Sequence, residues 1–205
     1  MTTLESLASA PPPELREYFS ALEPSEATHL LELTTRFRKG HPLAQAFELV
    51  VLDDQQTSNY YAYILRGPLT GTVLHLCHDD DSKVVYESLQ QFLDSDRDLR
   101  EPPAQITSPD STALADYCRQ LLDQTENKDR VVPVLVALVP CLTVSDLELW
   151  DRLGRHPNFY VAEAVGWAIE NYPRPELQAA AEALSQHRHP QAASAGKRAL
   201  SALKC

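Results

Sequence analysis

Residues 47–77, FELVVLDDQQTSNYYAYILRGPLTGTVLHLC, decide how the first half of this chain folds. The segment contains three short runs rich in β-branched and aromatic residues, which are typical of β-strands. These runs are residues 47–52, 59–65 and 71–77. The two segments between the runs have turn-forming composition and hairpin length. The pattern therefore predicts three adjacent antiparallel strands.

The pattern continues on the C-terminal side of this segment. Residues 84–86, VVY, are a candidate fourth strand, and Ser88 then stands where a helix N-cap is expected. Leu89, Phe92 and Leu93 follow at helical spacing. We expect them to form the buried face of a short closing helix.

Two helices are predicted on the N-terminal side. Residues 14–23 place apolar side chains at spacings of three and four, and Pro13 suits the first turn of that helix. A second helix begins near Ser25, a candidate N-cap, and ends at Gly40, before Pro42. Helices, a strand meander and a closing helix predict an α+β domain with an antiparallel sheet.

The chain has 205 residues, which favours two domains. Residues 98–110 contain three prolines and little apolar periodicity, as linkers do. We therefore expect a first domain at residues 1–100, a proline-rich linker at 101–110 and a second domain at 111–205.

The second half repeats itself with a period of 31 residues. Apolar residues recur in triplets: Leu122, Leu153 and Leu184; Ala137, Ala168 and Ala199; Leu138, Ile169 and Leu200; Cys141, Tyr172 and Leu203. The spacing predicts helix pairs with turns at His156-Pro157 and His189-Pro190. The pairs are residues 111–142, 143–173 and 174–204. Three stacked pairs can share a core, so an all-α stack of helical hairpins is expected.

Charge is distributed unevenly along the chain, whose formal net charge is −11. Residues 1–110 carry 18 acidic and 8 basic side chains, a net charge of −10, whereas residues 111–205 carry 11 and 10. Such a field repels phosphate backbones and anionic lipid, and it attracts cationic proteins. We expect no direct nucleic-acid or membrane binding.

Composition and the placement of the cysteines narrow the class of protein further. No apolar run approaches the ~20 residues that cross a bilayer, and residues 1–13 lack the features of a signal peptide. We expect a cytoplasmic protein. Cys77, Cys118, Cys141 and Cys205 form no CxxC pair, so neither disulfides nor structural zinc are indicated. The first three are expected to be buried thiols.

Residues 52–93 resemble the SUKH superfamily. The resemblance lies in the order of a strand, DDQQTSNYYAYI, a GP-containing turn, GTVLHLCHDDD, a VVY strand and the helix ESLQQFL. The early helical region departs from that pattern, because the usual Asn-Gly-Gly-like turn after the first helix is absent. Many SUKH-like proteins of bacteria are regarded as immunity proteins that neutralise a toxin encoded beside them. The resemblance therefore implies a protein ligand.

Residues 143–204 resemble HEAT-like repeats, judging from ELWDRLGRHPNFYVAEAVGWAIENY and ELQAAAEALSQHRHPQAASAGKRALSAL. That resemblance concerns architecture and implies no chemistry. Together the two resemblances imply a SUKH-like α+β domain followed by a HEAT-like stack.

Several side chains are candidates for contacting a partner. Acidic residues in the predicted turns could converge into an anionic patch for arginine and lysine; the alternative is a set of dispersed solubilising charges. These residues are Asp53, Asp54, Asp79, Asp80, Asp81 and Glu87. Tyr61 and Tyr63 share one face of their strand and Tyr60 takes the other, so one set is core and the other is a candidate exposed aromatic anchor.

The predicted second repeat supplies further candidates. Tyr160, Glu163 and Glu170 are expected to project from its second helix and to line one surface of the stack. Trp150 and Trp167 fall on opposite helices of that repeat, and both are expected to fill the core.

Metal and catalytic patterns are weak. His75, His78 and Asp79–Asp81 are the densest set of ligand types, but a strand would point the two histidines to opposite faces, and the aspartates lack the glycine and glutamate of an EF-hand. No P-loop, nucleophile elbow, HExxH or GxGxxG motif is present. Cys77 beside His78 is a poor dyad, because neighbouring strand residues face opposite ways.

These observations favour a binding protein over an enzyme, with no metal or cofactor. The first hypothesis is an immunity protein that neutralises a cationic, nuclease-like toxin through an acidic surface. The second is a scaffold or regulator that uses the helical repeats. The third is a metal-assisted hydrolase centred on His75, His78 and Asp79–Asp81.

Overall fold

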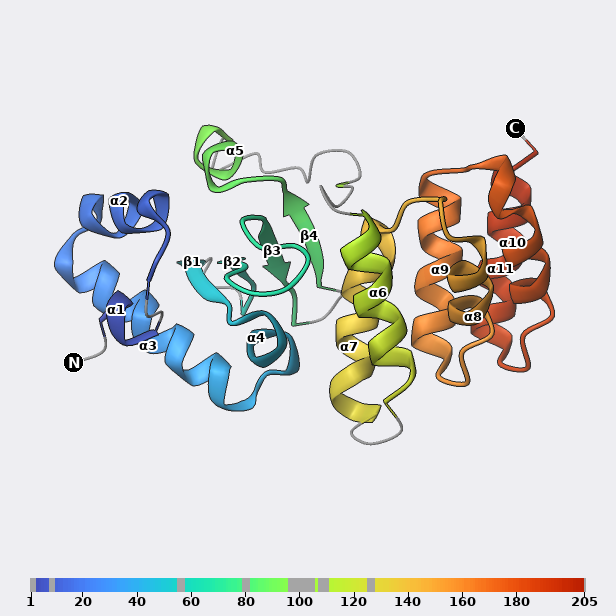
Figure 1. The fold of residues 1–205 in the computed structure, drawn as a ribbon, viewed down its shortest axis with the longest axis horizontal. Helices are drawn as coiled ribbons and strands as arrows, with labels where there is room; N and C mark the ends of the chain where they lie inside the picture. The colour runs from blue at the N-terminus through green and yellow to red at the C-terminus, as the bar shows by residue number, and fades with distance from the viewer. Residues whose placement is uncertain are drawn as a thin grey trace. The chain divides into compact units, whose positions relative to one another are not determined.

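The computed structural model describes residues 3–7, 10–54, 58–78, 82–95, 106, 111–124 and 128–204. The chain divides into two compact units, Met1–Ala104 and Gln105–Cys205, and the division falls within the proline-rich segment. The first unit is α+β and the second is helical, which confirms the predicted fold class (Figure 1).

In the first unit, helices precede and follow a strand meander in the sequence. Its elements are α1 (Leu4–Leu7), α2 (Pro13–Ala21), α3 (Pro24–Gly40), α4 (Pro42–Phe47), β1 (Val50–Asp54), β2 (Tyr60–Tyr63), β3 (Val73–Leu76), β4 (Lys83–Tyr86) and α5 (Leu89–Asp94). The sheet is antiparallel in the order β1-β2-β3-β4. Ser88 caps α5 as expected, since its hydroxyl accepts a hydrogen bond from the Gln91 amide at 3.1 Å. Leu89 and Phe92 are buried as predicted, but the prediction is wrong for Leu93, which is 43% exposed.

Two predicted boundaries are wrong, both because of proline. Pro24 occupies the first turn of α3, so Glu23 and not Ser25 is the N-cap. Pro42 starts α4 and does not simply end α3, and that helix takes Phe47 out of the predicted strand. Glu48, in the left-handed region with φ 48°, ends α4 and lets β1 start at Val50.

Side chains of two helices satisfy the backbone of β1, which lies at one edge of the sheet. The Tyr18 hydroxyl of α2 donates to the Leu52 carbonyl, and Arg38 of α3 donates to the Leu49 carbonyl at 2.9 Å. The buried Thr34 hydroxyl donates to Leu30 at 2.8 Å and accepts from the Val51 amide at 2.9 Å. The open edge of a sheet can pair with a strand of another chain. Here the hydroxyls of Tyr18 and Thr34 already bond to backbone groups of β1, which makes such pairing less favourable.

The second unit is a two-layer stack of helix pairs. Its elements are α6 (Ser111–Leu122), α7 (Lys128–Leu138), η1 (Val139–Cys141), α8 (Leu147–Gly154), α9 (Phe159–Asn171), η2 (Pro175–Leu177), α10 (Gln178–Ser185) and α11 (Pro190–Ala202). The second helices α7, α9 and α11 contact one another in order, and the first helices α8 and α10 are also in contact (Figure 1). The 31-residue period thus corresponds to one helix pair.

The repeated residues occupy equivalent positions in this stack. Ala137, Ala168 and Ala199 are each no more than 5% exposed, on α7, α9 and α11 respectively. None of the helices in the described part of the chain has the length and apolar character needed to cross a bilayer.

The role of Thr34 can be tested with a matched pair of variants. Thr34→Val should lower the free energy of unfolding by about 1–3 kcal/mol, because the Val51 amide would be buried without an acceptor. The neighbouring Thr35 hydroxyl donates only to its own helix, at the Leu31 carbonyl, and Thr35→Val should therefore cost less. Urea denaturation followed by circular dichroism measures both, and equal losses would contradict this role.

The close contact between α10 and α11 can be tested at Gly196. A Cβ there would lie 2.4 Å from the Ser185 nitrogen, so Gly196→Ala should destabilise the unit by about 1–3 kcal/mol although alanine favours helices. The exposed neighbour Lys197 provides the control, since Lys197→Ala should change stability by less than about 0.5 kcal/mol. Denaturation monitored by tryptophan fluorescence reports on this unit, and an unchanged midpoint for Gly196→Ala would refute the contact.

Candidate protein-binding surfaces

β1 and β3 end, and β2 and β4 begin, at the same end of the sheet. Tyr60 pairs with Asp54 on one side and with Leu76 on the other, so both strands reach this end at one level. The His78 amide donates to the Asn59 side chain at 3.0 Å and joins the segments that follow β3 and precede β2 directly. Asp53 and Asp54 lie here, half-buried. The predicted site residues Asp79, Asp80 and Asp81 lie outside the described residues.

Asp54 already has a partner at this end. Its carboxylate lies 2.9 Å from Nε2 of His29, a residue of α3 whose side chain is 54% exposed. An ion pair this exposed contributes little stability. The contact does occupy one oxygen of the Asp54 carboxylate.

Glu87 does not join this end of the sheet. It follows β4, and Tyr86 at the end of that strand pairs with Val73 at the start of β3. β4 therefore runs away from the β3–β4 connection and delivers Glu87, which is exposed, to the opposite end. The expected convergence of all six acidic residues is wrong for Glu87 because strand direction separates it from Asp53 and Asp54.

The tyrosines of β2 are core residues. Tyr61 is 5% and Tyr63 is 2% exposed, and Ala62 between them is fully buried, so both faces of the sheet are covered. The Tyr63 hydroxyl donates to Glu14 at 2.8 Å, and burial together with this hydrogen bond raises the pKa of Tyr63. Tyr60 packs against Phe37 at a ring distance of 4.8 Å. The exposed aromatic anchor expected on this strand is thus not found at Tyr61 or Tyr63.

The histidines proposed as metal ligands have other contacts. The His75 ring stacks on Tyr61 at 4.8 Å, and its Nδ1 lies 3.1 Å from Sγ of Cys77. His78 is exposed. Within the ranges that the structure describes, no group of three or more histidine, cysteine or acidic side chains could hold a metal ion. Asp79–Asp81 fall outside those ranges.

The three site residues predicted on the second repeat do come together, on the outer side of α9. Tyr160, Glu163, Trp167 and Glu170 follow one another at spacings of three, four and three, which places them on one helix face about 15 Å long. Tyr160 and Trp167 are each 51% exposed. We call these four residues the aromatic–acidic face.

Trp167 was expected in the core, and that expectation is wrong. Most of the remaining α9 side chains are small or branched and are buried against the neighbouring helices, so Trp167 is left on the outer face. The signal was present in the sequence, because Trp167 stands seven residues after Tyr160 and four after Glu163. Trp150 is 2% exposed and fills the core as predicted.

Neighbouring side chains hold the aromatic–acidic face in place. The Phe159 ring lies 4.0 Å from the Tyr160 ring and stacks on His189 at 3.9 Å. The Glu163 carboxylate accepts hydrogen bonds from the Gln191 amide at 2.9 and 3.1 Å. Such support lowers the entropy lost when a surface binds a partner.

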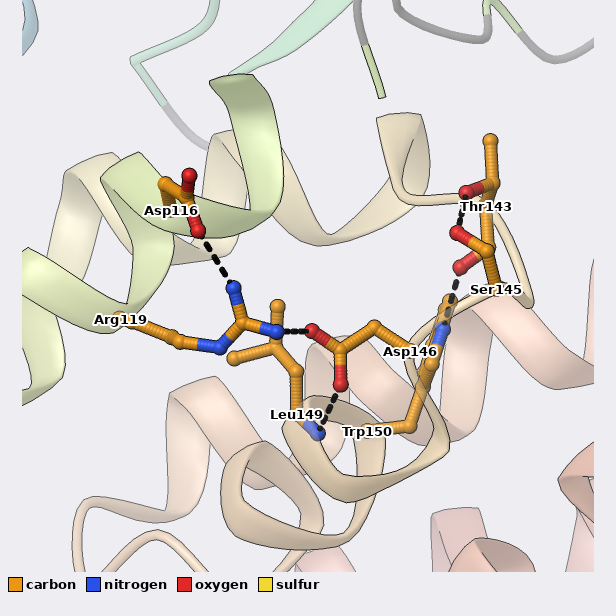
Figure 2. Close-up of polar contacts among 7 residues, drawn as sticks. All are labelled: Asp116, Arg119, Thr143, Ser145, Asp146, Leu149 and Trp150. Atoms are coloured by element: carbon orange, nitrogen blue, oxygen red, sulfur yellow. Dashed lines mark hydrogen bonds and ion pairs between the residues drawn. The ribbon is translucent and has the colours of Figure 1, made fainter. Parts of the chain in front are cut away.

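A polar network joins the first and second helix pairs behind this face (Figure 2). Arg119 of α6 donates to Asp116 at 2.6 Å and to Asp146, and the Asp146 carboxylate caps α8 by accepting from the Leu149 amide at 3.0 Å. The Trp150 indole donates to the Thr143 carbonyl at 2.8 Å (Figure 2). This last hydrogen bond holds Trp150 in the wall of a pocket.

That pocket has a volume of about 290 Å³. Its lining is formed by Leu142, Thr143, Val144, Trp150, Ala168, Tyr172, Arg174, Glu176 and Leu177. Arg174 and Glu176 are exposed, so the pocket carries both charge signs at its surface. Its apolar lining residues could accept an apolar side chain.

No family model, curated protein or solved structure matches this chain. The class that the structure defines is therefore an α+β unit with a four-stranded antiparallel sheet followed by a stack of helix pairs.

Two of the cysteines are buried thiols, as predicted. Burial raises the pKa of Cys118 to about 12. The pKa of Cys141 is also raised to about 12, mainly by burial and secondarily by the nearby Cys118 thiol. The prediction is wrong for Cys77, which is only half-buried. Because an unfolded thiol ionises near pH 8.5, these two thiols favour unfolding as the pH rises above that value.

Alkylation tests this assignment. With iodoacetamide at pH 8, native protein should be modified at Cys118 and Cys141 at least tenfold more slowly than protein in urea, because both thiols are protonated and shielded. Peptide mass spectrometry resolves the sites. Modification of either thiol at the same rate in native and unfolded protein would show that it is accessible.

Proposed function

We propose that this protein is an immunity protein, which binds and neutralises a basic toxin, in keeping with the SUKH-like order of the first unit and the HEAT-like pairing of the second. The observation that carries the proposal is the aromatic–acidic face of α9. Exposed tryptophan and tyrosine are among the residues that most often dominate protein interfaces, and the Glu163 carboxylate, whose donor Gln191 is neutral, favours a cationic partner.

Charge supports the same kind of partner. Residues 1–110 carry a net charge of −10, and α9 contains two acidic residues and no basic one. A field of this sign speeds association with a basic protein and disfavours nucleic acid. A nuclease that holds phosphate in a basic groove is a partner of this class, and an acidic protein bound there would compete with its substrate.

The toxin proposal is tested with the product of the neighbouring gene. Co-expression should give a complex that survives purification and should protect cells from that product. Trp167→Ala should raise the Kd at least tenfold, because truncation of an interface tryptophan typically costs 2 kcal/mol or more. The Kd should also rise with salt concentration.

Leu147 provides the matched control. It is 49% exposed in the same unit but lies on α8, outside the aromatic–acidic face. Leu147→Ala should change the Kd by less than threefold. Absence of any complex, together with absence of protection, would remove the toxin from consideration.

A scaffold or regulator is the second candidate, and the same face of α9 favours it, because a helical repeat unit can present such a surface to many kinds of protein. It predicts a stable partner without protection from toxin. The hydrolase hypothesis gains no support from the described contacts of His75 and His78.

A further inference from the structure

The aromatic–acidic face contains the same three-residue arrangement twice. In each copy, an aromatic residue of α9 is followed three positions later by a glutamate, and a side chain of α11 donates to that glutamate. The two sets are Tyr160, Glu163 and Gln191, and Trp167, Glu170 and Arg198. The corresponding residues are seven positions apart, so the two copies lie two helical turns from each other.

The second copy contains its own cation. Arg198 donates from Nε to the Glu170 carboxylate at 2.9 Å, and its guanidinium lies 5.8 Å from the centre of the Trp167 ring. A guanidinium near an aromatic face and paired with a carboxylate is a favourable arrangement, because the ring attracts the cation while the carboxylate accepts its hydrogen bonds.

The first copy has a neutral donor in the same place. Gln191 supplies two hydrogen bonds to Glu163 but no positive charge. The hydrogen bonds to Glu163 thus come from an uncharged group, one helical turn from the exposed Tyr160 ring. The Tyr160 ring packs against the Phe159 ring, with the ring centres 4.0 Å apart.

We infer that Glu163 and Tyr160 form the binding position for an arginine side chain of the partner protein. The inference rests on the proposed function and names the chemistry of the contact. A carboxylate offers about four acceptor positions and Gln191 donates to Glu163 twice, so the guanidinium can pair with Glu163 beside the Tyr160 ring without displacing Gln191. Arginine fits better than lysine because its planar group can stack on a ring and bond to a carboxylate at once.

The probe is a blocked tripeptide, acetyl-Gly-Arg-Gly-amide, titrated into the full-length protein and followed by NMR at the backbone amides of residues 160–167. These signals should shift saturably, and the indole signal of the buried Trp150 should stay fixed as an internal control. The lysine tripeptide should bind at least threefold more weakly.

Three variants test whether arginine binds at Glu163 and Tyr160. Gln191→Arg should pair Glu163 with a guanidinium of the same chain and so raise the Kd for the arginine tripeptide at least tenfold. Glu163→Gln, which removes the carboxylate, should have a similar effect. Arg198→Gln should instead open the second copy, so that a second tripeptide binds near Trp167. Thermal unfolding shows that each variant is folded.

The outcomes separate this inference from the proposed function. If the Kd of the arginine tripeptide is unchanged in Glu163→Gln and Gln191→Arg, or if the tripeptide does not bind at all, the arginine position is overturned even if the toxin complex forms. Tripeptide binding at Glu163 without any toxin complex leaves the arginine position standing and removes the toxin.

Discussion

The close approach of α9 to α11 determines which face of α9 meets the solvent. A Cβ at Gly166 would lie 2.6 Å from Cβ of Ala195, so only glycine allows the two backbones to come this near. The glycine side of α9 must face α11, and helical geometry then turns Tyr160 and Trp167 outward. The same approach brings the long side chains of α11 within hydrogen-bonding distance of the α9 glutamates. One steric constraint thus sets both the exposed rings and their polar support.

The two units contribute different properties to the proposed binding surface: negative charge in the first unit and exposed aromatic rings in the second. The first unit carries nearly all of the net negative charge, although part of it is internally paired, as at Glu48 and Arg66. The second unit is nearly neutral but presents two half-exposed rings alternating with carboxylates. Charge acts over a distance of about 10 Å at 0.1 M salt and mainly speeds encounter, whereas buried aromatic contacts slow dissociation. A protein that must capture a basic partner quickly and hold it benefits from both.

Local signals in the sequence predicted much of this structure, and packing decided the rest. Apolar periodicity identified the four strands and the three helix pairs, because burial imposes those periods. It misplaced Phe47, where a proline-initiated helix outweighs strand preference. It also assigned Trp167 to the core on hydrophobicity alone, although spacing put it on the face of Tyr160. The bond between Glu163 and Gln191 was not predictable, since it depends on how α9 and α11 are aligned.

The central claim is that the outer face of α9 contacts a basic protein partner, and site-specific photo-crosslinking in cells tests it most directly. Benzoylphenylalanine at position 160 should form a covalent product with the proposed partner, the product of the neighbouring gene. The same probe at Leu93, which is 43% exposed in the first unit, serves as the comparison. A product from position 160 that exceeds the product from position 93 at least fivefold is the predicted result. A product from position 93 with none from position 160 would contradict the account.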